Sequence, residues 1–209
     1  MGGADAAMGQ RTAVSGFTDL LFDMTGRSLP QDYPFALWEA LTARVPQLSG
    51  DDRVGVLPVR GAQNGELLLL SRRSKLALRL PDELIDAASI LAGSELAVAD
   101  NPIALGRASR RAITHYPTLH THLASGGIDE AEFVANVQDR FSDMNINARL
   151  ICGMRHTLGA AEQSISGYSL VVHDLKPDAS VLLQCTGIGE GRRFGCGIFI
   201  PYKVITDLE

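Results

Sequence analysis

Apolar and polar positions in the first half of the chain follow periods typical of both strands and helices. Residues 14–24 mix apolar and polar side chains and end in the turn residues Thr25 and Gly26, which indicates a strand. A helix is predicted next, because apolar residues recur at helical spacing after Asp32 and Pro34: Phe35, Leu37, Trp38, Leu41 and Val45. The other predicted elements are a hairpin of 54–59 and 66–70 around the turn GAQNG, an extended segment at 75–80, a helix at 81–91, and strands at 95–98 and 103–107.

The second half repeats this order of elements. The pattern predicts strands at 119–123, 148–152, 168–173 and 198–202, and helices at 129–141 and 177–184. The order β-α-β-β-α-β is typical of a ferredoxin-like sheet with helices on one face. We therefore expect an α+β protein of two ferredoxin-like units in tandem, residues 14–107 and 108–209, after a flexible tail of residues 1–13.

Composition and charge narrow the class of protein. With 209 residues, 45% of them hydrophobic, the chain can bury a core, and its net charge of −5 argues against coating a polyanion over its whole surface. The longest aliphatic run, Leu67–Leu70, is far shorter than the roughly 20 residues of a membrane-spanning helix. Three cysteines without metal-ligand spacing, and a start without signal-peptide features, predict a cytoplasmic protein.

The segment GIGEGRRFGCG, residues 187–197, is the most specific feature of the sequence. It is not a dinucleotide-binding loop, because Arg192 stands where that fingerprint needs glycine. It is not a P-loop either, because Cys196 stands where the P-loop motif needs its second glycine. Glycines that allow positive φ, together with two guanidinium groups, suit phosphate contacts, here predicted for Gly189, Gly191, Arg192, Arg193 and Gly195. The alternative is a helix C-cap followed by a glycine-rich bend.

Basic residues cluster at two places in this acidic chain, which predicts a local nucleic-acid surface. The first cluster is Arg60, Arg72, Arg73, Lys75 and Arg79, and the second is Arg107, Arg110 and Arg111. Alternation along the predicted strand would place Lys75, Ala77 and Arg79 on one face, where the two cations can follow a phosphate backbone. The alternative is an ordinary solvated sheet face.

Four blocks of sequence resemble the CRISPR-associated repeat-RNA endonucleases of the RAMP (repeat-associated mysterious protein) superfamily, particularly the Myxan branch. They are FDMTGRSLPQDYPFAL at 22–37, VLPVRG at 56–61, LLLLSRRSKLALRLP at 67–81 and GIGEGRRFGCGIFIP at 187–201. The resemblance implies tandem ferredoxin-like units and cleavage of precursor CRISPR RNA at a repeat stem-loop, without metal or other cofactor. It also implies other CRISPR effector subunits as partners.

The histidine that commonly acts as the base in this family is missing here, because residues 1–114 contain no histidine. We predict Tyr33 in its place, with Arg53 lowering the pKa of the phenol or steadying the phosphorane, and Ser49 or Ser28 holding the reacting group. The alternative is that Tyr33 only packs beside the helix start and that the arginines are surface charges.

All five histidines lie in the second half of the chain. His120 and His122 share one face of a predicted strand, but no Asp, Glu or Cys stands at ligand spacing, so no metal site is expected. His156, beside Arg155 in a predicted polar loop, is the best placed substitute base.

Two other functions remain open from the sequence. One is a catalytically inactive RNA-binding subunit of an effector complex, which the missing early histidine favours. The other is a small-molecule or structural domain of ferredoxin-like shape, which the complete glycine loop disfavours.

Overall fold

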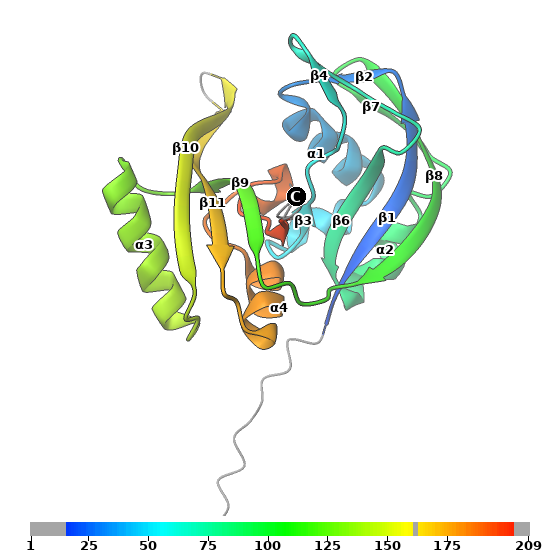
Figure 1. The fold of residues 1–209 in the computed structure, drawn as a ribbon. Coiled ribbons are helices and arrows are strands. Elements are labelled where there is room, and N and C mark those ends of the chain that lie inside the picture. The colour runs from blue at the N-terminus through cyan, green and yellow to red at the C-terminus, as the bar shows by residue number, and fades with distance from the viewer. Residues whose placement is uncertain (1–15, 161–162, 203–209) are drawn as a thin grey trace, which may run out of the picture.

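The computed structural model describes residues 16–160 and 163–202, so the predicted tail of residues 1–13 lies outside the described residues. The chain forms an α+β fold, as predicted, in which the described residues build four α-helices and three antiparallel sheets (Figure 1). The helices are α1 (Tyr33–Arg44), α2 (Ile85–Ser89), α3 (Glu130–Asp143) and α4 (Pro177–Thr186). Among these residues, no helix is both long and apolar enough to cross a membrane.

The N-terminal sheet has the strand order β3-β6-β1-β8-β7. Its strands are β1 (Phe17–Gly26), β3 (Gly55–Val56), β6 (Lys75–Pro81), β7 (Glu95–Val98) and β8 (Asn101–Ala112). Alternation along β1 sends Leu20, Phe22 and Met24 into a core that α1 completes with Leu37 and Leu41. The predicted strand is confirmed over the described residues but continues through Thr25 and Gly26, where a turn was expected, and the helix predicted after Asp32 is confirmed as α1.

The C-terminal sheet has the order β10-β11-β9-β12. Its strands are β9 (Leu119–Ser125), β10 (Arg149–Ala160), β11 (Gln163–His173) and β12 (Ile200–Pro201). Phe133, Val137 and Phe141 of α3 pack against the sheet in a second core. Helix α3 covers the side that faces away from the N-terminal sheet, so the opposite side of this sheet faces the N-terminal half (Figure 1).

The hairpin predicted from 54–59 and 66–70 is wrong. Gly55 and Val56 pair with β6, while β5 (Leu67–Leu69) pairs with β2 (Ser28–Pro30) and β4 (Ala62–Asn64) in a separate three-stranded sheet. The hairpin that does form joins β4 and β5 through a turn at Gly65 and Glu66.

The two halves of the chain join through a small apolar cluster. Leu57 and Ala77 from the N-terminal half pack there with Ile198 from the C-terminal half. Leu21 and Ile200 pack against its edge. On the face of β6 that is turned away from the N-terminal core, Ala77 is therefore buried, and Lys75 at the start of the strand is exposed.

Candidate nucleic-acid interface

The glycine loop (residues 187–197) is a tight structure held against strand β9. All five of its glycines have positive φ, which confirms the backbone freedom expected from the sequence. A Cβ on Gly197 would meet the backbone of Ile188, and one on Gly189 would meet that of Ser125. Two hydrogen bonds fix the loop beside β9: Gly197 N–H donates to the Leu123 carbonyl (2.6 Å), and Glu190 N–H donates to the side-chain Oγ of Ser125 (2.6 Å).

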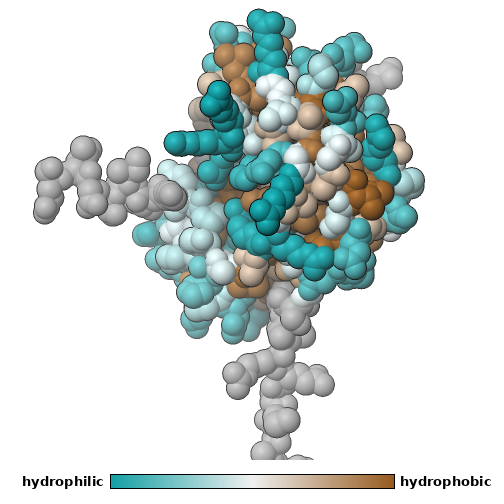
Figure 2. Space-filling view, turned by 90° about the vertical axis from the view of Figure 1, so that its right-hand side faces the viewer, coloured by the Kyte–Doolittle hydropathy of each residue, from teal (hydrophilic) through white to brown (hydrophobic). Residues whose placement is uncertain are grey.

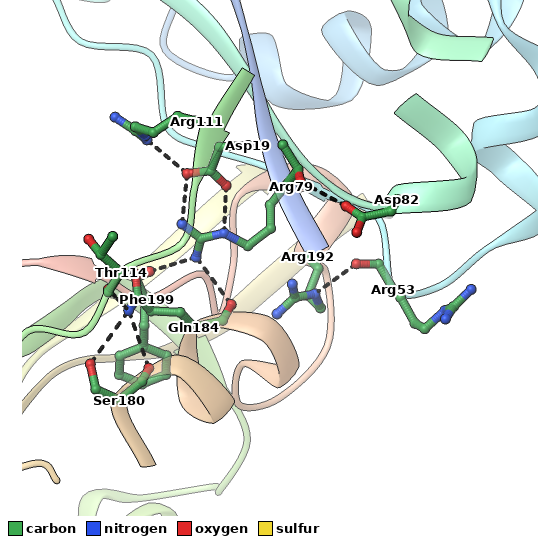
Figure 3. Close-up of polar contacts among 11 residues, drawn as sticks. Asp19, Arg53, Arg79, Asp82, Arg111, Thr114, Ser180, Gln184, Arg192 and Phe199 are labelled. Atoms are coloured by element: carbon green, nitrogen blue, oxygen red, sulfur yellow. Dashed lines mark hydrogen bonds and ion pairs between the residues drawn. The ribbon is translucent and has the colours of Figure 1, made fainter. Parts of the chain in front are cut away.

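The two arginines of the glycine loop differ in their exposure. Arg193 is exposed and its guanidinium lies 5.1 Å from the ring centroid of Phe194, where it is open to a phosphate. Arg192 is only 8% exposed, its Nε donates to the Arg53 carbonyl at 3.4 Å, and its two terminal nitrogens have no partner among the described residues (Figure 3). Burial and the charge of Arg79 lower the pKa of Arg192 to about 10. The phosphate contact predicted for Arg192 would require this part of the loop to turn outward.

Arg79 is buried, which corrects its predicted place on a solvated face. Its Nε and one terminal nitrogen donate to the Asp19 carboxylate (2.7 and 3.1 Å) in a pair that is almost fully buried (Figure 3). The other terminal nitrogen donates to the carbonyls of Phe199 (2.8 Å) and Gln184 (3.1 Å). Arg79 therefore fastens the C-terminal half to the N-terminal sheet and is not free to bind RNA in this conformation.

A basic cavity of about 590 Å³ lies between the two halves. Its lining includes Arg60, Arg73, Lys75 and Arg111 of the predicted basic clusters. Lys75 pairs with Asp23, and Arg111 pairs with Asp19 at 2.8 Å, whereas Arg60 and Arg73 have no ion-pair partner within 16–160 and 163–202. The buried Ser74 hydroxyl donates to the Arg60 carbonyl (2.8 Å) and accepts from Ser71 N–H (2.9 Å), which holds the segments that carry these two arginines together.

The remaining predicted basic residues lie outside this cavity. Arg72 is exposed beside Arg73, while Arg107 and Arg110 are exposed on β8, where Arg110 pairs with Asp86. Figure 2 views the side of the molecule on which β8 lies in Figure 1, and hydrophilic side chains there separate small hydrophobic areas. The structure thus divides the predicted RNA-binding cations into a group in the cavity and a group on the surface of β8 and the loop before β6.

Tyr33 is buried, and its environment contradicts the idea that a cation lowers its pKa. Its hydroxyl accepts a hydrogen bond from Val59 N–H at 2.8 Å, and burial raises the pKa of the phenol above its usual value near 10. This hydrogen bond positions the segment that leads to Arg60. Tyr33 thus packs in the core and makes one hydrogen bond to the backbone, while its role as a base stays a prediction that its raised pKa disfavours.

Arg53 and Ser49 do not join Tyr33 in one site. Arg53 pairs at 2.6 Å with both Asp51 and Glu83. The Ser49 hydroxyl donates to the Pro46 carbonyl (2.7 Å) inside the 3₁₀ turn Pro46–Gly50. Ser49 lines a different cavity from Tyr33, beside Arg192 and Arg193 of the glycine loop. Ser28 lies buried on β2, in the separate three-stranded sheet.

A second cavity between the halves, of about 480 Å³, contains two histidines that are 34 residues apart in sequence. His122 of β9 and His156 of β10 have ring centroids 4.4 Å apart. Tyr33, Phe194 and Gly195 line the same cavity, and Leu57 and Pro58 line both this cavity and the basic one. The histidine cavity and the basic cavity are therefore neighbours on either side of the segment Leu57–Pro58.

His120 and His122 share one face of β9, as predicted, but the ring that His122 contacts is that of His156 across the sheet. The His120 ring instead packs edge-on against Tyr202, with centroids 5.2 Å apart. Burial lowers the pKa of both His120 and His122, and the charges of Arg60 and His156 respectively lower them further. No group of three or more metal-ligating side chains occurs among the described residues.

Comparison with known proteins places the chain among CRISPR-associated proteins. The family model described as Cas6 Crispr matches residues 18–204. The CRISPR-associated endonuclease Cas6 of Myxococcus xanthus (strain DK1622) is 32% identical over 187 residues, which cover 88% of this chain and 81% of that relative.

Two solved structures have a similar fold at low sequence identity. The product of a Cas6-related gene from Pyrococcus furiosus gives a TM-score of 0.58 at 11% identity, covering 88% of this chain and 98% of that one. Thermus thermophilus Cse3, bound to an RNA representing a pre-cleavage complex, gives 0.52 at 12% identity over the same shares of the two chains. The resemblance inferred from the sequence blocks is confirmed, and the chain belongs to the CRISPR-associated Cas6 family.

Proposed function

We propose that this protein matures CRISPR RNA by binding the repeat stem-loop of the precursor and cleaving it without metal through attack of a 2′-hydroxyl. Family membership and the Myxococcus xanthus endonuclease support the class of reaction. The observation that carries the proposal is the groove between the two halves, where a cavity rich in arginine adjoins a cavity with two imidazoles. Cations to hold phosphates and groups to transfer protons are what this reaction needs.

The proposed RNA path follows the unpaired cations. Arg60 and Arg73 in the basic cavity, and Arg193 at the glycine loop, carry the main phosphate contacts. Arg72, Arg107 and Arg110 extend the positive surface. Lys75 and Arg111, which are paired with Asp23 and Asp19, contribute less. Gly189, Gly191 and Gly195 shape the loop so that its backbone can approach the RNA closely.

Each half is proposed to be one ferredoxin-like unit, with the division moved from the expected residues 107 and 108 to the end of β8 at Ala112, because residues 108–112 pair with β1 in the N-terminal sheet. The similar strand orders support two such units, because the first strand is central in both: β1 lies between β6 and β8, and β9 lies between β11 and β12. After cleavage the protein is proposed to keep its product hairpin, since the cations of the groove contact phosphates that the reaction leaves in place. A cytoplasmic location and association with other CRISPR effector subunits complete the proposal.

Binding of a repeat hairpin is expected to weaken steeply as salt rises, because phosphate contacts release counterions. Arg60→Ala and Arg73→Ala should each lower the slope of log affinity against log salt by about one unit. Arg140→Ala, on the far side of the molecule in α3, is the matched control and should leave the slope unchanged. Equal slopes for all three variants, measured by fluorescence anisotropy, would remove these arginines from the interface.

The cleavage proposal is tested by incubating the pure protein with labelled repeat RNA in excess EDTA. We expect two fragments of defined length, which a protein-free control does not produce. The buried Tyr33 and the paired Arg53 favour one other function, that of an RNA-binding subunit without activity. Tight binding of the repeat with no cleavage in EDTA or in magnesium would establish that second function.

A further inference from the structure

We propose that His122 and His156 are the general acid–base pair of this RNA cleavage, an assignment that rests on the proposed function. They replace the early histidine that the chain lacks, and they do so from the C-terminal half. One imidazole removes the proton of the attacking 2′-hydroxyl, and the other donates a proton to the leaving 5′-oxygen.

The strands of the C-terminal sheet explain how the two rings meet. Strand β11 lies between β9 and β10, so the backbones that carry the two histidines are separated by two strand spacings, roughly 10 Å. The β11 residue opposite His156 is Gly167. Since glycine has no side chain to fill the space, both imidazoles can lean over β11 and approach to a centroid distance of 4.4 Å. A side chain at position 167 would also collide with the backbone of Ala124.

The position of the pair suits a substrate that lies in the groove. The rings line a cavity that Tyr33 and Pro58 of the N-terminal half and Gly195 of the glycine loop also line. The basic cavity begins on the other side of Leu57 and Pro58. Arg60 in the basic cavity can therefore bind one phosphate of the RNA backbone while the next nucleotide lies in the histidine cavity. The 2′-hydroxyl of that nucleotide would then lie at the imidazoles.

The surroundings of His122 favour its neutral form. Burial and the nearby His156 lower the pKa of His122, so its neutral imidazole can accept the proton of the 2′-hydroxyl. The other titratable groups that share the cavity are Tyr33 from α1 and Cys196 from the glycine loop, and both are neutral because burial raises their pKa values. The cavity lining contains no carboxylate among the described residues, and His120 lies two residues along β9.

The reaction step balances without any further reactant. The neutral ring accepts the proton of the 2′-hydroxyl while its oxygen forms a bond to phosphorus. The bond from phosphorus to the 5′-oxygen breaks, and that oxygen receives the proton of the charged ring. The products are a 2′,3′-cyclic phosphate and a 5′-hydroxyl, and the two rings have exchanged their protonation states.

The test compares His122→Gln and His156→Gln with His115→Gln, whose histidine is exposed outside the histidine cavity. We expect each of the first two variants to lose about 10²–10⁴-fold in the single-turnover rate in EDTA, with unchanged affinity for the repeat hairpin. The bell-shaped pH dependence of the wild type should lose one limb in each of them. His115→Gln should keep the wild-type rate and profile.

A second measurement is independent of activity. In the free protein, NMR titration of the imidazole protons should show a higher pKa for His122 in His156→Gln than in the wild type, because the neighbouring charge is removed. Wild-type rates in both glutamine variants would overturn the acid–base pair while leaving the endonuclease function intact. Loss of wild-type cleavage in EDTA with recovery in zinc would also overturn it, since the pair would then be a metal ligand. A wild type that never cleaves would overturn the endonuclease function and the pair together.

Discussion

Asp19→Asn is expected to lower the free energy of unfolding by about 3–5 kcal/mol, because it leaves a buried guanidinium without its counter-charge. Asp19 is 2% exposed and binds Arg79 through both carboxylate oxygens, while one of them also accepts from Arg111. The amide retains the shape of the carboxylate but removes its charge and one acceptor. Arg79 then remains buried between the two halves without a negative charge, with one amide oxygen and the carbonyls of Gln184 and Phe199 as its acceptors.

The matched control for this prediction is Asp86→Asn, which breaks an exposed pair with Arg110. That change should cost between zero and about 1 kcal/mol, since water and salt screen an exposed ion pair. Urea denaturation, monitored by circular dichroism, measures the free energy of unfolding of both variants. If Asp19→Asn were as mild as Asp86→Asn, the buried pair would not be what fastens the halves together.

Replacing the 2′-hydroxyl at the cleavage position by hydrogen is expected to reduce cutting to the level of a protein-free control. That hydroxyl is the nucleophile of the proposed reaction, so no protein group can compensate for its removal. The affinity of the protein for the RNA should change little, because the proposed contacts of Arg60, Arg73 and Arg193 are made to phosphates, which the deoxy substrate keeps.

The control for this prediction is an RNA with a single deoxynucleotide placed two positions away from the cut. It should be cleaved at the wild-type rate, measured in single turnover on a denaturing gel. Cleavage of the deoxy substrate at the original position would mean that water attacks the phosphorus, and the roles assigned to His122 and His156 would then fail.

Most helices and strands could be predicted from the sequence because their periodicity is local. The apolar spacing that indicates β1, α1 and α3 lies within each segment itself. The predictions at 14–24, 34–45 and 129–141 therefore agree with the structure over its described residues. The hairpin of 54–59 with 66–70 failed because strand partners are chosen over long distances in the chain. Gly55 pairs with Arg79 and Leu68 pairs with Leu29, both far away in the sequence, while the local hairpin is the shorter one of Gln63 with Leu68.

The site was predicted only in part, for a related reason. Alternation placed Arg79 on the correct face of β6 but could not tell that the C-terminal half covers that face. Asp19, the partner of Arg79, is 60 residues away in the sequence and was missed. His156 was singled out from its polar surroundings, whereas its approach to His122 depends on the register that sets Gly167 between them. The strand predicted at 168–173 did not reach Gly167, whereas β11 begins at Gln163, so this close approach could not be read from the sequence.

The chemical end of the upstream fragment tests the central claim most directly. The protein is incubated with repeat RNA in EDTA, and the mass of the upstream fragment is measured at short times. Attack by the 2′-hydroxyl predicts a 2′,3′-cyclic phosphate on this fragment and a 5′-hydroxyl on the downstream one. A 3′-hydroxyl on the upstream fragment with a 5′-phosphate on the downstream one would contradict the claim, because that pair of ends arises only when another nucleophile attacks the phosphorus.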